Sequence, residues 1–380
     1  MIELLLNGAI YGGIFGIICW LSILLLPWRP ASVREQIEPD LSLSAKQDLH
    51  DITVLIPARN EAPYIQQTLD GVTVQGKNLQ IFVIDDQSSD DTARLAQEKG
   101  AQVISGTTPP TGWSGKLWAL EQGLRQVKTP YVLLLDADIT LAPGIISTLR
   151  KKVQAENRSL VSLMATPPME NAIERLLMPA FIFFFKLLYP FGLANKPDTR
   201  MAAAAGGCIL VETQSLRSIG AFGSLHNALI DDCTLAKQIK HSGKNIWLGL
   251  SHAARSHRGY HGLKPIWEMV ARTAYTQLNY SSILLMVCTV IMISMFWLAP
   301  FVFLLLPDLK TYMISTIVWA AMFLAYAPTL NYYHRTPLWA VALPVIGTLY
   351  LAMTWTSAIR FWRGERARWK DRQYESKTNH

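Results

Sequence analysis

Four long stretches of this chain are apolar and carry no charged residue, and they limit what the chain can fold into. They cover residues 4–26, 282–306, 312–330 and 338–359. At roughly 1.5 Å of rise per helical residue, each is about long enough to cross a hydrocarbon core of about 30 Å. The first has neither a basic start nor a small-residue cleavage site, which favours a retained anchor over a signal peptide. The pattern therefore predicts a multi-pass membrane protein.

Charge predicts the orientation of the chain. No Lys or Arg precedes the first apolar stretch, whereas Arg29, Arg34 and Lys46 follow it. By the positive-inside rule, the segment from about residue 28 to 281 should be cytoplasmic. Three further crossings would then leave the C-terminus outside, although seven basic residues follow Ile359. Either one of the last three stretches is re-entrant or the charge rule fails here. We favour an internal tail and an incomplete span, around Pro300 or Pro344.

The net charge of +7 does not by itself indicate a nucleic-acid-binding protein. The basic residues crowd into the tail beside an apolar stretch, and such clusters usually meet anionic lipid headgroups. The four cysteines have no paired or metal-type spacing, and two of them lie in apolar stretches. This argues against a disulfide framework and agrees with a reducing compartment. We expect a membrane partner and no nucleic acid.

Between residues 51 and 138, short apolar runs alternate with amphipathic stretches. The predicted strands are 52–58, 80–86, 101–105 and 131–138, and the predicted helices are 61–72, 89–100 and 116–127. This alternation predicts an α/β fold with a parallel, doubly wound sheet. In such sheets, ligands bind outside the carboxyl ends of the strands.

Polar residues gather at that edge of the predicted sheet. Residues 59–61 follow one strand, Asp85 and Asp86 end the next, and Asp136 and Asp138 end a third. Because Mg²⁺ and Mn²⁺ prefer carboxylate oxygens, two such acids can hold a cation together with substrate phosphates. A solvated turn is the alternative for these acids taken alone, since Asp favours turns. The three converging strand ends favour a ligand site.

The order of several motifs resembles the inverting, family 2 glycosyltransferases of the GT-A fold. The motifs are VLIPARNE (54–61), VIDDQSSDDTA (83–93), GKLWAL (115–120), DAD (136–138), GGC (206–208) and DDCTL (231–235). The likeness covers about residues 51–280, and the order of the motifs carries it, since a lone D-x-D is common by chance. It implies a Rossmann-like GT-A nucleotide-sugar-binding domain and a hexosyltransferase that uses Mn²⁺ or Mg²⁺.

The resemblance also implies a role for each matching residue. Asp232 would be the catalytic general base, and Asp138 with Asp136 would hold the metal. We expect the charge of Asp231 to raise the pKa of Asp232, which would improve the base. The nucleotide sugar would be bound by Pro57, Arg59, Glu61, Asp86, Lys116, Asp136, Gly206 and Gly207, and the diphosphate or the acceptor would face Asp231, Arg258 and Arg272.

A narrower likeness indicates the hopene-associated (hopanoid-biosynthesis-associated) glycosyltransferases and, more distantly, ceramide glucosyltransferase. It rests on PTGWSGKLWAL (110–120), ERLLMPAFIFFF (174–185) and MVARTAYTQLNYS (269–281). Processive relatives carry Q/R-x-x-R-W near the membrane, where this chain keeps Arg272 but has Met269 and Thr273. We therefore expect transfer of a single sugar.

The predicted layout is an N-terminal anchor (1–27), a linker (28–50), a cytoplasmic catalytic domain (51–281), C-terminal membrane helices (282–359) and a basic tail (360–380). The predicted activity is transfer of one sugar, from a UDP-sugar first, to a lipid acceptor such as a hopanoid at a bacterial inner membrane. The alternatives are a polyprenyl-phosphate sugar synthase, whose ionised acceptor needs no base, and a catalytically silent membrane scaffold. A transporter is disfavoured because the apolar stretches hold no ionisable residue that could line a pathway.

Two further segments admit more than one interpretation. Residues 172–193 contain only ten apolar residues between Arg175 and Lys186, about half a bilayer, so we expect an interfacial segment, with a buried core helix as the alternative. His252, His257 and His261 cluster in one loop. We expect a basic loop that touches phosphate, through Arg258 above all, and give less weight to a zinc site.

Overall fold

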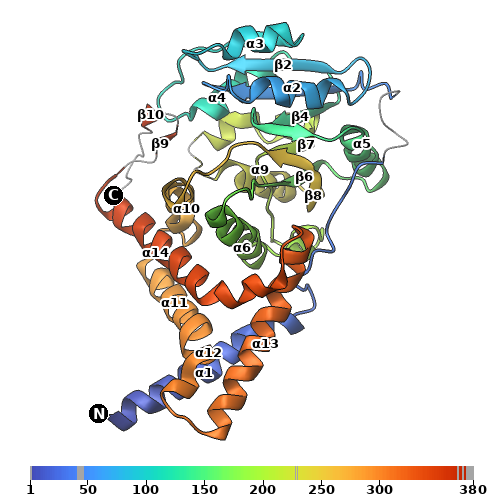
Figure 1. Ribbon diagram of the computed structural model, residues 1–380. Helices are drawn as coiled ribbons and strands as arrows, with labels where there is room; N and C mark the ends of the chain where they lie inside the picture. The colour runs from blue at the N-terminus through green and yellow to red at the C-terminus, as the bar shows by residue number, and fades with distance from the viewer. Residues whose placement is uncertain are drawn as a thin grey trace. The chain divides into compact units, whose positions relative to one another are not determined.

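The computed structural model describes residues 2–40, 47–226, 228, 230–365, 368–369 and 372–373. The chain forms two compact units, which are described separately. The α/β unit contains Glu35–Pro168, Phe191–Gly259 and Ala367–His380, and the helical unit contains Met1–Arg34, Met169–Pro190 and Tyr260–Arg366. Figure 1 shows both units with their elements labelled.

The α/β unit is built on one sheet with the strand order β3-β2-β1-β4-β7-β6-β8-β5. The strands are β1 (Ile52–Ala58), β2 (Gln80–Asp85), β3 (Gln102–Ser105), β4 (Tyr131–Leu135), β5 (Ile139–Leu141), β6 (Leu160–Thr166), β7 (Cys208–Glu212) and β8 (Ile246–Ser256). The first four are parallel, as predicted. However, β7 runs antiparallel to both β4 and β6, and β5 runs antiparallel to β8. The predicted parallel arrangement is therefore confirmed for β1 to β4, while the whole sheet is mixed because the strands after β4, which were not predicted, include antiparallel ones.

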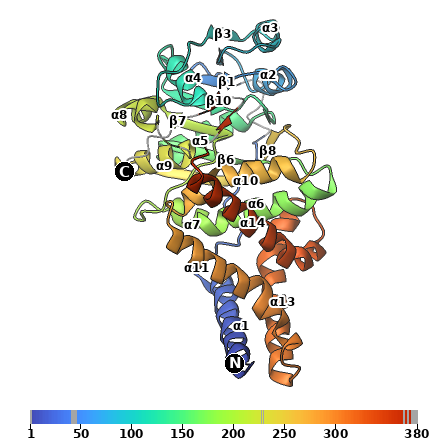
Figure 2. The ribbon, with the colours of Figure 1, turned by 90° about the vertical axis from the view of Figure 1, so that its left-hand side faces the viewer.

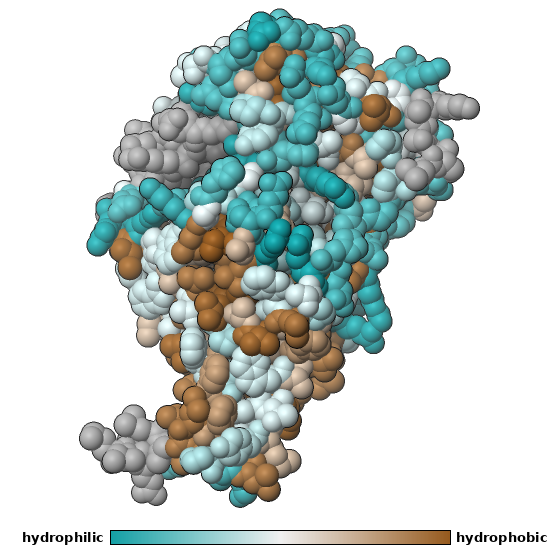
Figure 3. Space-filling model, in the orientation of Figure 1, coloured by the Kyte–Doolittle hydropathy of each residue, from teal (hydrophilic) through white to brown (hydrophobic). Residues whose placement is uncertain are grey.

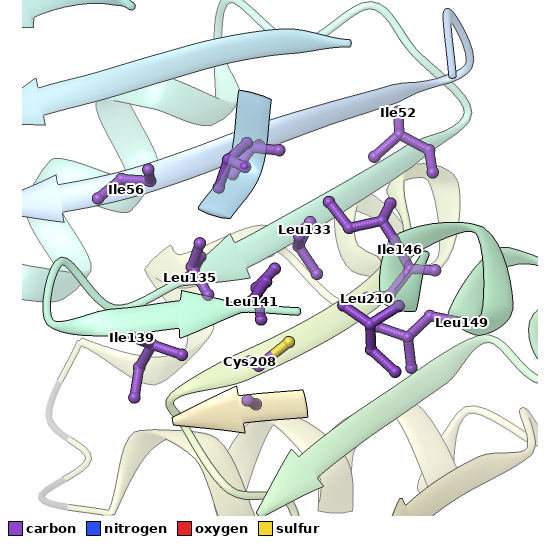
Figure 4. Close-up of a cluster of buried hydrophobic side chains, with 14 of the residues drawn as sticks. Ile52, Ile56, Leu133, Leu135, Ile139, Leu141, Ile146, Leu149, Cys208 and Leu210 are labelled. Carbon is purple, nitrogen blue, oxygen red and sulfur yellow. The ribbon is translucent and has the colours of Figure 1, made fainter. Parts of the chain in front are cut away.

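Helices cover both faces of this sheet. They are α2 (Ile65–Thr73), α3 (Thr92–Glu98), α4 (Gly115–Leu124), α5 (Ile145–Ala155), α7 (Phe191–Ala194), α8 (Thr213–Ser218), the 3₁₀ turn η2 (Ala221–Leu225) and α9 (Asp231–His241). Successive residues of β1 face opposite ways: Val54 and Ile56 join a core cluster with α2, α3 and α5, and Leu55 joins one with α4, α8, η2 and α9. Figure 4 shows part of the first cluster. A strand buried on both faces reads as a near-continuous apolar run, which is the pattern of residues 52–56, where only Thr53 is polar.

The predicted elements exist, but several ends differ. The predicted helix 61–72 begins only at Ile65, because Glu61 to Tyr64 form a turn in which the Tyr64 N–H donates to the Glu61 carbonyl. The predicted strand 131–138 ends at Leu135, where the chain turns and the Ile139 N–H donates to the Asp136 carbonyl. Asp136 and Asp138 therefore lie on a turn just past the strand.

Part of the predicted linker is packed. Residues 35–37 run along β8, with the Ile37 N–H donating to the Leu250 carbonyl and the Leu250 N–H to the Glu35 carbonyl. Glu38 accepts hydrogen bonds from the His252 backbone and lies 2.8 Å from its ring nitrogen Nδ1. In the tail, β9 (Arg368–Trp369) pairs antiparallel with β10 (Arg372–Gln373).

The helical unit contains the apolar stretches. Its elements are α1 (Ile2–Leu25), α6 (Ala172–Leu188), α10 (Leu263–Gln277), α11 (Ser282–Ile293), the π-helical η3 (Ser294–Leu298), α12 (Ala299–Phe301), the 3₁₀ turn η4 (Val302–Leu304), α13 (Leu309–Tyr332), the 3₁₀ turn η5 (Pro337–Ala342) and α14 (Leu343–Trp362). Among the described residues, three helical segments are long and apolar enough to cross a membrane, namely Ser282–Leu304, Leu309–Tyr332 and Pro337–Trp362, and Ile10–Leu25 is a shorter apolar helix. On the face shown in Figure 3, apolar side chains gather over this unit.

Helix α1 packs closely on the segment that begins with α11. A Cβ added at Gly12 would lie 2.5 Å from Leu298, and one added at Gly16 would lie 2.5 Å from the Ser294 carbonyl oxygen. Small residues four apart let two helix backbones approach each other in this way, as is common between membrane helices. The indole N–H of Trp20 donates to the Met295 carbonyl at 3.0 Å.

Candidate active site

The ends of β1 and β2 are tied together by hydrogen bonds. The Arg59 side chain donates to the Asp86 carbonyl at 2.6 Å, and the Asn60 N–H donates to the Ser88 hydroxyl at 2.9 Å. Asn60 has a positive φ of 52°, a conformation that Asn adopts more readily than most residues. Asp86 is 2% exposed. The two strand ends predicted to form the nucleotide-binding edge therefore lie together.

The start of helix α4 places a lysine on the acidic turn. Ser114 caps this helix by accepting a hydrogen bond from the Leu117 N–H at 3.2 Å. Lys116 in its first turn forms an ion pair with Asp136, with 2.6 Å between Nζ and Oδ1. Burial opposes the charge of Lys116, but Asp136, Asp231 and Asp232 outweigh it and raise the pKa of the lysine. Lys116 is therefore held as a cation at this edge of the sheet.

The proposed base is held by the glycine pair. Asp232 lies in the first turn of α9, and its Oδ2 accepts a hydrogen bond from the Gly206 N–H at 2.8 Å. A Cβ at Gly206 would lie 3.2 Å from this oxygen, which is tight enough that the carboxylate would have to shift, and in ordinary contact with Lys116 Nζ at 3.5 Å. The Gly207 carbonyl accepts from the Asp136 N–H at 3.0 Å. The backbone of the glycine pair thus forms hydrogen bonds with both Asp136 and Asp232.

These residues share one pocket in the α/β unit. Its polar lining consists of Lys116, Asp136, Asp231 and Asp232 with the backbone of Gly206, and the rest is apolar, including Pro57. Residues predicted from five separate motifs are therefore neighbours in space. This arrangement can hold a polar ligand between a cation and two or three carboxylates.

The pKa of Asp232 is raised to about 6, first by burial and second by the neighbouring charge of Asp231. The expected direction is confirmed, although burial is the larger cause. A base must be ionised to accept a proton, so turnover should rise with pH as Asp232 deprotonates. We expect kcat/KM to fall below about pH 6, which a pH–rate profile at saturating metal would show.

Asp231→Asn should move this acid limb to lower pH, because it removes the charge that opposes ionisation of Asp232. The Asn oxygen can still accept the hydrogen bond that the Asp232 N–H donates to Asp231 at 3.1 Å, so the fold should be kept. The measurement is the same profile for the variant. An unchanged limb would show that another group controls it.

Asp138 belongs to a second cluster with Arg258 and Glu61. Arg258 Nη2 lies 2.6 Å from both carboxylate oxygens of Glu61, and Arg258 Nε lies 3.3 Å from Asp138 Oδ2. The Ser256 hydroxyl donates to the same Asp138 oxygen at 3.0 Å. The guanidinium also lies 5.2 Å from the centre of the Tyr64 ring. Arg258 therefore neutralises two carboxylates at the predicted donor site.

The residues around Asp138 fit a divalent cation that the substrate helps to hold. In the part of the chain that the structure describes, no group of three or more His, Cys, Asp or Glu side chains is placed to hold a metal alone. Asp136 and Asp138 offer two carboxylates at one turn, and Mg²⁺ commonly takes one or two carboxylates plus phosphate oxygens. The chemistry of this donor set suits Mg²⁺ or Mn²⁺ and does not favour a closed protein cage.

Arg258→Ala should strengthen binding of Mn²⁺ alone, because it leaves Asp138 and Glu61 without their cation. We expect roughly a tenfold gain in metal affinity, a typical size for one nearby charge at a partly exposed site. Arg258→Lys keeps the charge and should bind Mn²⁺ much as the parent does. Titration of Mn²⁺ without nucleotide checks this, and equal affinities in all three proteins would contradict it.

Some predicted residues lie elsewhere. Arg272 is exposed on α10 and belongs to the helical unit, whereas the residues described above belong to the α/β unit. His252 contacts Glu38, and His261 also belongs to the helical unit. The three histidines thus form no metal-holding group among the described residues.

Sequence reasoning gave no role to Ser256 and Tyr64, which contact Asp138 and Arg258. Neither residue carries a signal in the sequence, since Ser and Tyr are common in loops and turns. His257 was predicted only as part of a basic loop that touches phosphate or, with less weight, as a zinc ligand. Its Nε2 is buried without a hydrogen bond, and its backbone N–H donates to the Asp138 carbonyl at 2.9 Å.

The fold of the α/β unit, with this acidic edge at its strand ends, is that of the GT-A class. Residues 53–220 match the family model described as Glycosyl transferase family 2. The α/β unit therefore carries a family 2 glycosyltransferase domain with the Rossmann-like GT-A fold, and the prediction that the chain is a hexosyltransferase enzyme is confirmed.

Two known proteins are similar along most of the chain. The 4,4'-diaponeurosporenoate glycosyltransferase of Staphylococcus aureus (strain USA300) is 24% identical over 341 residues, covering 85% of this chain and 88% of that protein. The solved mannosyltransferase PcManGT from Pyrobaculum calidifontis, in complex with GDP-Man and Mn²⁺, has a TM-score of 0.56 and 18% identity, covering 95% of this chain and 98% of that one. The second likeness shows the fold.

Proposed function

We propose that this protein transfers one sugar, with inversion, from a nucleoside diphosphate sugar to a lipid hydroxyl at a membrane. The gathering of Lys116, Asp136 and Asp232 around one pocket supports this most strongly. Opposite charges are placed there as the reaction requires: cations for a departing diphosphate and a carboxylate for the attacking hydroxyl. The matches to glycosyltransferases supply the reaction class.

Each residue has a distinct task in this proposal. Asp232 takes the proton of the acceptor hydroxyl as that oxygen attacks the anomeric carbon. Its carboxylate is oriented by the Gly206 and Cys233 N–H groups, at 2.8 and 2.7 Å. Lys116 offsets the negative charge that grows on the diphosphate, and Arg258 moves from its carboxylates to the phosphates. A divalent cation at Asp138 and Asp136 would add positive charge to the leaving group.

The donor is proposed to be a nucleotide sugar bound over the ends of β1, β2 and β4. Arg59, Glu61 and Asp86 lie at the first two of these ends. The solved mannosyltransferase was in complex with GDP-Man and Mn²⁺, which supports this donor class and a metal without fixing the base. We propose a UDP-sugar because of the resemblance to ceramide glucosyltransferase and the hopene-associated enzymes.

A donor screen tests the proposal. Protein in detergent is given UDP-, GDP- and dTDP-sugars with and without Mn²⁺ or Mg²⁺, and binding and slow hydrolysis are measured. We expect one nucleotide sugar to bind and be hydrolysed only with metal. If the protein melts cooperatively but binds none of them, the proposal fails and the silent scaffold takes its place.

The acceptor is proposed to be a lipid, with a hopanoid or related isoprenoid alcohol as the first candidate. The similar protein of S. aureus is named for a lipid-like acceptor, 4,4'-diaponeurosporenoate, and this chain has three apolar helical segments of spanning length. Because that name denotes a carboxylate, an already ionised acceptor is the main alternative, as is a polyprenyl phosphate. Incubation with labelled donor and either a hopanoid polyol or a polyprenyl phosphate separates the two. Label that stays water-soluble with every lipid would contradict a lipid acceptor.

A further inference from the structure

Within the described residues, the chain passes between the helical unit and the α/β unit at four points; the boundary between Arg366 and Ala367 lies outside them. They are the peptide links Arg34–Glu35, Pro168–Met169, Pro190–Phe191 and Gly259–Tyr260. Because the α/β unit is one folded body, all four links open to the same aqueous compartment. We call this compartment the junction side. It gives a reference against which each end of the apolar segments can be placed.

Helix α6 stays close to the junction side. It has only 17 residues, Ala172–Leu188, and lies between two of the four links. A helix of this length is about 25 Å long, and only Tyr189 and Pro190 remain to reach the second link. The helix therefore cannot run to the far side of a bilayer and return, so any residue that contacts it is near the junction side.

The carboxyl end of α13 is also on the junction side. Lys186 of α6 is 1% exposed, and its Nζ donates to the Ala31 carbonyl at 3.2 Å and to the Thr329 hydroxyl at 3.0 Å. Ala31 lies three residues before the link at Arg34, and Thr329 lies in the last turn of α13. The segment from α11 to η4 runs away from the junction side, and α13 returns to it.

Helix α14 contacts junction-side elements at its middle and at its end. The Tyr350 hydroxyl donates to the Leu177 carbonyl of α6 at 2.9 Å. Ten residues later, Arg360 forms two hydrogen bonds with Glu268 of α10, at 2.6 and 2.8 Å. Helix α10 follows the link at Tyr260 directly and packs along α14 (Figure 2). Both contacts place α14 near the junction side, which is also the side on which residues 333–342 begin.

Two aromatic contacts agree with this direction. The indole N–H of Trp355 donates to Thr289 in α11, and Phe361 stacks on Tyr280 just before α11, with ring centres 4.5 Å apart. The closer a residue of α14 lies to the C-terminal end of this helix, the closer its contact lies to the start of α11. The exposed Phe361 and Trp362 then lie where aromatic side chains favour the headgroup region.

From these contacts we propose that residues 333–362 do not cross the membrane but enter and leave it on the junction side, forming a bilayer-interface surface with α6 and α10. The chain then crosses three times, through α1, through α11–η4 and through α13. The basic tail lies in the same compartment as the catalytic unit. This also removes the conflict between seven basic tail residues and the positive-inside rule. The proposal does not depend on which sugar or acceptor is used.

Single cysteines and a membrane-impermeant maleimide test this in inside-out and right-side-out vesicles of a bacterial host. In a background with Cys19, Cys208, Cys233 and Cys288 replaced, the exposed positions are Lys244→Cys in the α/β unit, Lys310→Cys, His334→Cys and Glu365→Cys. We expect 244, 334 and 365 to react in one kind of vesicle and 310 only in the other. A fourth crossing, through residues 333–362, would instead make 365 react together with 310 and would overturn the proposal.

A second measurement needs no cysteine substitutions, so it can be used if the cysteine variants fold poorly. The full chain is fused to a reporter that works only in the cytoplasm or only outside it, and the same reporters are placed after residue 308 as the opposite-side control. Matching reporter activity at both positions would overturn the proposal. Opposite activity, with the end of the chain scoring like the α/β unit, would support it.

Discussion

Asp232→Asn should reduce kcat by roughly 10²- to 10⁴-fold while leaving donor affinity within about threefold. The amide cannot take the proton of the attacking hydroxyl, but it fills the same space beside Gly206. Both Asp232 oxygens accept backbone hydrogen bonds, so the variant loses one of two. Steady-state transfer to lipid and donor binding by calorimetry are the two measurements.

The same variant distinguishes the acceptor classes. A phosphate or carboxylate acceptor is already ionised and needs no base, so its transfer should survive the substitution. Asp70→Asn is the matched control, since Asp70 is a half-exposed acid on α2 that contacts Lys99 outside the site. Full transfer by Asp232→Asn, with donor affinity intact, would therefore favour the polyprenyl-phosphate alternative over a hydroxyl acceptor.

Asp138→Ala should reduce kcat/KM by roughly 10²- to 10³-fold, a loss of about 3–4 kcal/mol of transition-state stabilisation. It removes one of the two carboxylates proposed to hold the cation and leaves Arg258 paired with Glu61 alone. The affinity for Mn²⁺, measured in the presence of UDP or GDP, should fall as well. The spectroscopic signal of the unbound ion gives this affinity.

Asp70→Ala provides the control for stability and net charge. If Asp138→Ala loses turnover but binds Mn²⁺ as tightly as the control, Asp138 has a role other than metal binding. If neither property changes, the metal site lies elsewhere. Melting temperatures of both variants with and without nucleotide show whether the fold is kept.

The sequence predicted the parallel half of the sheet well because that half is built from local units. Each of the strands β1, β2 and β3 is followed by its own crossover helix, and the apolar runs and turn residues indicate this directly. The antiparallel strand β7 was missed because its partners, β4 and β6, are set by contacts distant in sequence. Strand direction leaves no mark in a short apolar run such as residues 208–212.

The site was predicted unevenly for a similar reason. Asp136, Lys116, Gly206 and Asp232 could be named because they stand in ordered motifs, and the structure places them around one pocket. The contact of Arg258 with Glu61 spans 197 positions and follows no spacing rule. The proposed side of the tail also rests on tertiary contacts, through Lys186 and Tyr350, that no hydropathy profile contains.

The close fit of α1 against η3 has a practical consequence for anyone who wishes to work with a water-soluble form. Removing residues 1–34 would take away Trp20 and the glycine face, and would uncover the apolar surface of Met295, Phe296 and Ala299, all now buried. It would also leave the buried ammonium of Lys186 without the Ala31 carbonyl. A chain shortened in this way should aggregate rather than dissolve, so detergent or lipid nanodiscs are needed even though the chemistry belongs to the α/β unit.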